Sequence, residues 1–125
     1  MLNRKIYCFW VGHNNQEMNE NRKAGLASLF VNSKVEVVLV DNDNLHSYIV
    51  DGHPLHEGFQ YLSDVHKADY LRTYFMHHHG GGYSDIKPCN WDWNPYFDAL
   101  ENSLAYGIGA PEDEGELSVT PRQRP

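Results

Sequence analysis

The sequence predicts an α/β domain with a mostly parallel sheet, and three observations support that class. Strand-like apolar segments at residues 4–11 and 34–40 alternate with helix-like segments at 16–31 and 65–79. The segment KVEVVLV is apolar nearly throughout, which is typical of a parallel strand covered on both faces. The chain has 125 residues, 41% of them hydrophobic, so it can fill the core of one compact domain.

The first strand and helix follow from residues near the start of the chain. Residues 4–11 (RKIYCFWV) are apolar and β-prone, and Gly12 ends the strand. Asn14 or Asn15 can then cap a helix over about residues 16–31, because an asparagine side chain accepts hydrogen bonds from the first backbone N–H groups. Gly25 lowers the propensity of this segment to form a helix.

The next segments continue the alternation of strands and helices. Residues 34–40 are rich in β-branched side chains and predict the second strand, which a DNDN turn follows. A short helix over about residues 44–50 comes next, before Gly52 and Pro54 mark an irregular stretch.

The helix over residues 65–79 has the clearest signals. Ser63 or Asp64 can cap its start, and the three glycines at 80–82 stop it. Its apolar stripe consists of Val65, Ala68, Leu71, Phe75 and Met76.

The rest of the chain is predicted to contain two more strands and a tail. GYSDI at residues 82–86 and LAYGIGA at 104–110 read as strands, while residues 111–125 are polar and proline-rich. We therefore divide the chain into a domain over residues 1–110 and a frayed tail over 111–125.

Charge and composition exclude several kinds of partner. A formal net charge of -7 argues against nucleic acid, whose phosphates require clustered Lys and Arg. No apolar run is long enough for a membrane span or a signal-peptide core, so we expect a soluble cytoplasmic protein and leave peripheral association with a membrane open. Cys8 and Cys89 are expected to be reduced thiols.

Polar and aromatic side chains follow the predicted parallel strands. Trp10 ends the first strand, Asp41 and Asp43 follow the second, and Asp85 ends the strand after the glycines. Ligands of such sheets bind beyond the carboxyl ends of the strands, so these four side chains are candidates for one site.

Asp69 and Arg72 form a second candidate group. Their spacing of three places them on one face of the helix. A solvated ion pair, contributing about 0.3–0.5 kcal/mol, is the simplest interpretation, and a joint role in ligand binding is the alternative. The three glycines also have two interpretations, a helix stop or a close approach of the backbone to a ligand.

The longer run HKADYLRTYFMHHHGGGYSDIKP (residues 66–88) resembles the core motif of sugar transferases that contain an Asp-x-Asp sequence. This family, of the GT-A type, includes initiating mannosyltransferases, capsule and lipooligosaccharide transferases and glucosylating toxins. The resemblance covers most of residues 4–110 and is specific in about the central 20. The matching residues are Ala68, Asp69, Leu71, Arg72, Gly81, Gly82, Tyr83 and Asp85, and the strand that ends at Trp10 resembles the first strand of the family.

The resemblance implies a fold, a reaction and a site. The fold would be an abbreviated GT-A domain, similar to the N-terminal half of a catalytic domain. The enzyme would transfer a hexosyl group, with retention, from a UDP- or GDP-sugar to a hydroxyl of a glycan or polysaccharide. Trp10 would flank the nucleobase, and Asp69 and Arg72 would hold the sugar. The other implied donor contacts are Gly81, Gly82, Tyr83 and Asp85.

The sequence departs from the family pattern at one position. Lys87 occupies the place of the second Asp, which in family members is the main protein ligand of Mn²⁺ or Mg²⁺. Lysine cannot ligate such a cation, although its ammonium can neutralise phosphate charge. Either Lys87 replaces the metal, or Asp85 holds a metal with other help. Asp85, Lys87 and Arg72 are the candidate catalytic residues, because the departing diphosphate needs its charge stabilised.

Other interpretations stay open. The chain could be a transferase fragment, a non-catalytic module that binds nucleotide sugars, or an unrelated α/β domain. A zinc site built from consecutive His77, His78 and His79 is disfavoured, because a helix fans them about 100° apart. His66 and His79 could line the donor site, with core or surface placement as the alternative.

Overall fold

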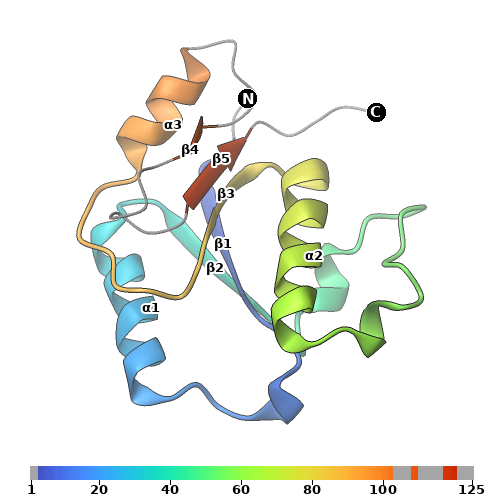
Figure 1. Cartoon of the computed structure of the whole chain (residues 1–125). Coiled ribbons are helices and arrows are strands. Elements are labelled where there is room, and N and C mark those ends of the chain that lie inside the picture. Colours follow the sequence, from blue (N-terminus) through green and yellow to red (C-terminus); the bar gives the residue numbers. More distant parts are fainter. Residues whose placement is uncertain (1–2, 103–107, 110–116, 121–125) are drawn as a thin grey trace.

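In the computed structural model, which describes residues 3–102, 108–109 and 117–120, five strands form one sheet in the order β2-β1-β3-β5-β4 (Figure 1). The strands are β1 (Lys5–Trp10), β2 (Glu36–Asp41), β3 (Gly81–Ser84), β4 (Ile108–Gly109) and β5 (Leu117–Thr120). The α-helices are α1 (Glu20–Asn32), α2 (Asp64–His78) and α3 (Asn94–Glu101). Three short 3-10 helices are η1 (His13–Asn15), η2 (Leu45–Tyr48) and η3 (Phe59–Tyr61).

The α/β class is confirmed, and the sheet is mixed. Strand β1 pairs in parallel with both β2 and β3. Strand β5 pairs antiparallel with β3 and with β4, so the parallel part is limited to three neighbouring strands. The tail prediction was wrong at residues 117–120, which form β5. A four-residue strand between polar and proline-rich segments has too little alternation to be detected from sequence.

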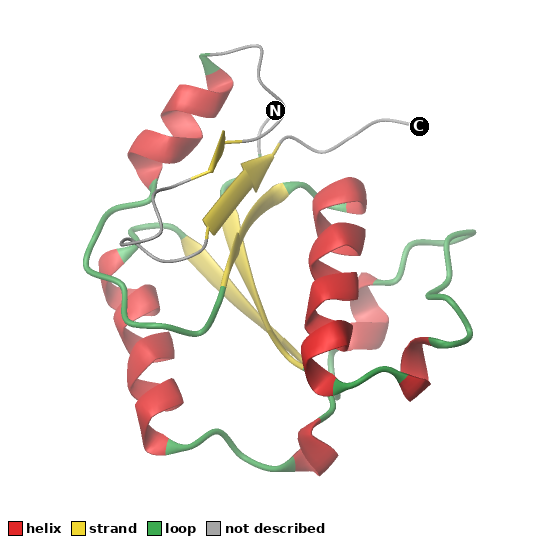
Figure 2. Ribbon diagram, in the orientation of Figure 1, coloured by secondary structure: helices red, strands yellow, loops and turns green. Residues whose placement is uncertain are grey.

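Both faces of the parallel strands are buried. Figure 2 shows the sheet between α1 on one side and α2 on the other. In β1, Ile6 and Cys8 belong to the core on the α1 and α3 side, while Tyr7 and Phe9 belong to the core on the α2 side. This burial on both faces explains the nearly continuous apolar character of the strand sequences.

Helix α1 begins four residues later than predicted. Asn19 caps it, and its side-chain oxygen accepts a hydrogen bond from the N–H of Arg22 at 2.9 Å. Asn14 and Asn15, the predicted caps, instead lie in η1 with φ of 49° and 60°. That left-handed conformation is one that asparagine tolerates and that a helix cap does not use.

The boundaries of α2 agree closely with the sequence. Ser63 is the cap, since its hydroxyl accepts a hydrogen bond from the N–H of His66 at 3.2 Å. Gly80, with φ of 70°, ends the helix, and Gly81 begins β3 at once. The short helix expected over residues 44–50 is the single 3-10 turn η2.

Helix α3 has no counterpart in the prediction. It starts after the fully buried Trp93 and buries Phe97. Arg4 attaches it to the start of β1 through contacts with Asp98 at 2.5 Å and Glu101 at 3.0 Å.

The last predicted strand is present in part. Of the strand predicted over residues 104–110, the part at 108–109 is β4 and the rest lies outside the described residues. In the described ranges, no helix has both the length and the apolar character needed to cross a bilayer.

Candidate functional site

The topology creates a crevice beside the carboxyl end of β1. From β1 the chain crosses through α1 to β2 on one side, and it then returns through α2 to β3 on the other side. Neighbouring strands whose connections leave in opposite directions open a ligand crevice beyond their carboxyl ends. A cleft of about 350 Å³ lies at this position, between the ends of β1 and β3, and we call it the central cleft. Its lining residues are Phe9, Trp10, His13, Arg22, Asp64, Val65, Ala68, Asp69, Tyr83, Ser84, Asp85, Ile86 and Lys87.

Five of the eight predicted catalytic and donor-binding residues line this cleft. They are Trp10, Asp69, Tyr83, Asp85 and Lys87. Arg72 lies next to it, with its guanidinium carbon 5.3 Å from the centroid of the Tyr83 ring.

The two glycines of the predicted set lie elsewhere in the fold. Gly81 and Gly82 are buried within β3, where Gly82 pairs with Ile6 of β1. Gly81 has φ of 84°, and a Cβ there would lie 2.8 Å from the carbonyl oxygen of Lys5. The glycine is thus required by strand packing rather than by the cleft, whose β3 lining begins at Tyr83.

Asp85 is the centre of a polar network. The Tyr83 hydroxyl donates a hydrogen bond to Asp85 Oδ1 at 2.5 Å, and Lys87 Nζ lies 3.3 Å from Asp85 Oδ2. Both carboxylate oxygens therefore have partners. The Asp85 side chain is 28% exposed and the Lys87 side chain 55%, so the lysine is the more accessible end of the pair.

The segment that carries Lys87 is held by α1. Gly25 packs so closely on it that a Cβ would lie 3.0 Å from the Lys87 carbonyl carbon. The Cys89 N–H donates to the Ser28 hydroxyl at 2.8 Å, and the Asn32 side chain donates to the Cys89 carbonyl at 2.6 Å. Gly25, which the sequence suggested would only weaken the helix, allows this close approach.

Trp10 is positioned by η1 and the residue after it. Its indole N–H donates to the Gln16 carbonyl at 3.0 Å. The His13 ring is parallel to the indole, with 3.6 Å between centroids and 2° between planes. The Arg22 guanidinium carbon lies 5.7 Å from the centroid of the indole. An aromatic face at the end of β1 is thus present as predicted, with an imidazole stacked on it.

The turn that holds His13 is strained and tied down. Gly12 has φ of 90°, and the three residues after it also have positive φ. The Asn42 side chain donates to the Gly12 carbonyl at 2.9 Å and accepts from the Gly12 N–H at 2.8 Å. Asp64 Oδ2 lies 3.5 Å from His13 Nδ1. Backbone strain of this kind is often found at functional sites.

Sequence reasoning missed three of the residues in the central cleft. His13 and Arg22 were assigned no role, and Asp64 was considered only as a helix cap. The available signal for a left-handed turn was Gly12 together with Asn14 and Asn15, because glycine and asparagine adopt that conformation readily.

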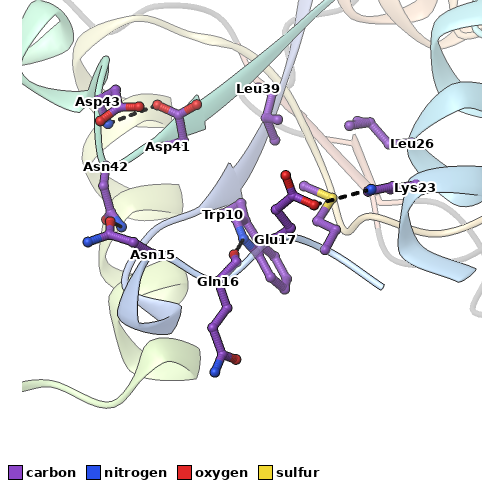
Figure 3. Close-up of a pocket in the computed structure, with 11 residues that line it drawn as sticks. Trp10, Asn15, Gln16, Glu17, Lys23, Leu26, Leu39, Asp41, Asn42 and Asp43 are labelled. Carbon is purple, nitrogen blue, oxygen red and sulfur yellow. Dashed lines mark hydrogen bonds and ion pairs between the residues drawn. The ribbon is translucent and has the colours of Figure 1, made fainter. Parts of the chain in front are cut away.

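A second cleft, of about 600 Å³, shares Trp10 and extends toward the end of β2 (Figure 3). We call it the β2 cleft. Asp41 Oδ1 accepts hydrogen bonds from the N–H groups of Asp43 and Asn44 at 2.9 and 3.0 Å. Glu17 Oε2 lies 3.7 Å from Lys23 Nζ, an ion pair that Figure 3 draws as a dashed line. The four side chains predicted at the carboxyl ends of the strands are thus divided between two clefts. Trp10 lines both, Asp41 and Asp43 line the β2 cleft, and Asp85 lines the central cleft.

The two cysteines are core residues and form no disulfide, as predicted. Burial raises the pKa of the Cys8 thiol to about 12, and the negative charge of Asp85 adds to this effect. The negative charge of Asp85 thus acts on the Cys8 thiol in the core beneath the cleft.

The histidines considered for the site lie outside the central cleft. His79 Nε2 is 2.8 Å from the Tyr48 carbonyl, and its ring packs 5.0 Å from Phe75. His66 Nδ1 is 2.9 Å from the Ser63 hydroxyl at the start of α2. Among the residues with described positions, no group of three His, Cys, Asp or Glu side chains has a metal-binding arrangement.

Comparison of the chain with models of known protein families, with curated proteins and with solved structures found no match.

Proposed function

We propose that this chain binds a nucleotide sugar and transfers its hexosyl group to a hydroxyl acceptor. The observation that carries the proposal is the convergence of an aromatic face, two carboxylates and a lysine in the central cleft, at the switch point of an α/β sheet. These are Trp10, Asp69, Asp85 and Lys87, which come from three separate segments of the chain. In this proposal the domain is an abbreviated form of the GT-A fold.

The donor would span the two clefts that meet at Trp10. An indole face stabilises a nucleobase by stacking, and carboxylates accept hydrogen bonds from ribose hydroxyls. The β2 cleft offers Asp41 and Asp43 for the ribose. The base, whether uracil or guanine, would lie along Trp10 after His13 has moved off its face, or on the opposite face.

The diphosphate and sugar would occupy the central cleft. Asp69 is exposed on α2 and lines the cleft, so its carboxylate is suited to accept hydrogen bonds from sugar hydroxyls. Lys87 would place its ammonium beside the phosphates. Arg72 would act as a positioning residue, because its guanidinium lies on the ring of Tyr83, which in turn holds Asp85.

The chemical step requires stabilisation of the leaving group. The bond between the anomeric carbon and the phosphate oxygen breaks, and its electron pair stays on the nucleoside diphosphate. The acceptor oxygen forms the new bond to the anomeric carbon. In a retaining reaction the acceptor approaches on the face of the leaving group, so the departing phosphate oxygen can take the acceptor proton. Preorganised positive charge beside that oxygen lowers the barrier.

The side chains present fit a divalent cation poorly. Mn²⁺ and Mg²⁺ prefer several oxygen ligands. In the central cleft, Asp85 Oδ1 is hydrogen-bonded by Tyr83, and the Lys87 ammonium lies 3.3 Å from Oδ2. A cation there would be repelled by the ammonium. We therefore favour a site in which protein cations carry out the role of the metal.

A turnover assay tests the proposal. UDP-glucose, UDP-galactose, UDP-N-acetylglucosamine and GDP-mannose would each be incubated with the full chain and simple glycoside acceptors, and release of UDP or GDP measured. Asp69→Asn should reduce release from the active donor by about tenfold or more, since a charged hydrogen-bond acceptor to the sugar is lost. Asp51→Asn, at an exposed position outside the lining of both clefts, is the matched control.

The outcomes separate the alternatives. Release of UDP or GDP above background that Asp69→Asn reduces and Asp51→Asn does not supports the transferase. Saturable binding without release would instead identify a non-catalytic module for nucleotide sugars. Absence of both would contradict the proposal and favour an unrelated α/β domain.

A further inference from the structure

Two cationic side chains from different elements line the central cleft, Arg22 on α1 and Lys87 after β3. The charge of Lys87 is already offset in part, because its ammonium lies 3.3 Å from Asp85 Oδ2. A diphosphate brings more negative charge than this one paired lysine can balance. A cleft that binds a diphosphate without a metal ion therefore needs a further cation.

Arg22 meets this requirement. Its position is fixed by the start of α1, where its N–H donates to the Asn19 cap at 2.9 Å. Its guanidinium carbon lies 5.7 Å from the Trp10 ring centroid, beside the proposed nucleobase face. Within the described residues, no carboxylate forms an ion pair with it. A guanidinium can donate two parallel hydrogen bonds to phosphate oxygens.

The packing of α1 links Arg22 to Lys87. Arg22, Gly25 and Ser28 are spaced by three and so share one face of the helix. Gly25 contacts the backbone of Lys87, and Ser28 accepts a hydrogen bond from Cys89. Arg22 is therefore on the helix face that holds the lysine segment, and the two cations belong to elements that are fixed to each other.

We propose that Arg22 and Lys87 form a two-cation clamp on the diphosphate of the donor, so that the central cleft binds it without a divalent metal. Arg22 supplies the bidentate contact, and Lys87 supplies a point charge on the other phosphate. Trp10, adjacent to Arg22, orients the nucleoside. This inference rests on the proposed function and adds to it the residue that recognises the diphosphate.

The test is calorimetric titration of the full chain in EDTA with UDP, GDP, uridine and guanosine. Arg22→Gln should weaken binding of the preferred diphosphate by about tenfold or more, since charged hydrogen bonds to phosphate are lost. Binding of the matching nucleoside, which lacks the diphosphate, should be unchanged. Arg22→Lys, which keeps the positive charge, should weaken diphosphate binding less than Arg22→Gln does. Lys5→Gln is the charge-matched control, because Lys5 is at the opposite end of β1 and pairs with Glu36. Circular dichroism would establish that each variant is folded.

Each outcome decides one question. Tight diphosphate binding in EDTA that Arg22→Gln weakens and Lys5→Gln does not would support the clamp. Diphosphate binding that is unaffected by Arg22→Gln, or that requires added Mn²⁺, would overturn the clamp while leaving the donor site intact. If neither UDP nor GDP binds with or without Mn²⁺, the proposed function fails as well.

Discussion

Gly25 of α1 lies against the backbone of Lys87, and a Cβ on this glycine would be 3.0 Å from the Lys87 carbonyl carbon and 3.2 Å from its Cα. A residue that looks unfavourable for a helix thus sets the position of a cleft residue that is distant in the sequence. Because α1 holds this segment also through Ser28 and Asn32, the site and the helix packing are coupled.

Gly25→Ala tests that coupling. Alanine favours a helix over glycine by up to about 1 kcal/mol, whereas overpacking against backbone costs typically about 1–3 kcal/mol. We expect a net decrease of about 1 kcal/mol in the free energy of unfolding, measured by urea denaturation. Ala27→Gly, on the exposed side of α1, gives the effect of helix propensity alone. A more stable Gly25→Ala variant would show that the Lys87 segment moves easily.

Gly12→Ala should be more destabilising than Gly52→Ala. Both glycines have positive φ, 90° and 80°, so both alanines incur backbone strain. At Gly52 nothing lies within 4 Å of the added Cβ, while at Gly12 it would be 2.2 Å from Asp64 Oδ1. We expect an additional loss of about 0.5–1 kcal/mol for Gly12→Ala, measured by thermal denaturation, because Asp64 must turn away and loses its contact with His13. Equal losses would mean that Asp64 turns away without cost.

The buried thiol of Cys8 predicts a loss of stability at alkaline pH. Its pKa is about 12 in the folded chain, against 9.0 for an ordinary thiol. Between these values the unfolded chain releases the proton and the folded chain keeps it, so stability is complete below pH 9 and falls above it. The contribution is at most about 1.4 kcal/mol per pH unit.

Urea denaturation at pH 8 and pH 10 measures this effect. Cys8→Ala should lose less stability between the two pH values than the wild type, although it is less stable at both because of the cavity. Identical pH dependence in the two proteins would contradict a buried, protonated thiol. Lysines and tyrosines titrate in both proteins, so the difference between the two pH dependences isolates the contribution of Cys8.

Lys87→Asp creates an Asp-x-Asp sequence at residues 85–87. The new carboxylate removes the ammonium beside Asp85 and offers a second oxygen ligand. We expect donor binding in EDTA to weaken by about tenfold or more, and Mn²⁺ to restore it. Wild-type binding should be insensitive to Mn²⁺. A wild type that depends on Mn²⁺ as strongly as the variant would favour the alternative in which Asp85 holds a metal.

The parts of the fold that sequence reasoning captured are those with local causes. Trp10 and Asp85 were placed at one sheet edge because parallel strands bring their carboxyl ends together. Ser63 was among the predicted caps because its hydroxyl precedes a clear apolar stripe.

The features that sequence reasoning missed depend on contacts between residues that are distant in the sequence. His13 reaches Trp10 only through a left-handed turn held by Asn42, and Arg22 faces the cleft because α1 starts at Glu20. Gly81 was assigned to the ligand, although the carbonyl oxygen of Lys5 explains it. No local pattern reports such tertiary neighbours.

The most direct test of the account is calorimetric binding of UDP- and GDP-sugars to the full chain in EDTA, with Asp85→Ala as the comparison. We expect saturable binding of one donor class, with an affinity that Asp85→Ala changes by about tenfold or more, because Asp85 holds Tyr83 and Lys87 together in the cleft. Absence of binding to every donor, with or without Mn²⁺, or binding that Asp85→Ala leaves unchanged, would contradict a donor site in the central cleft.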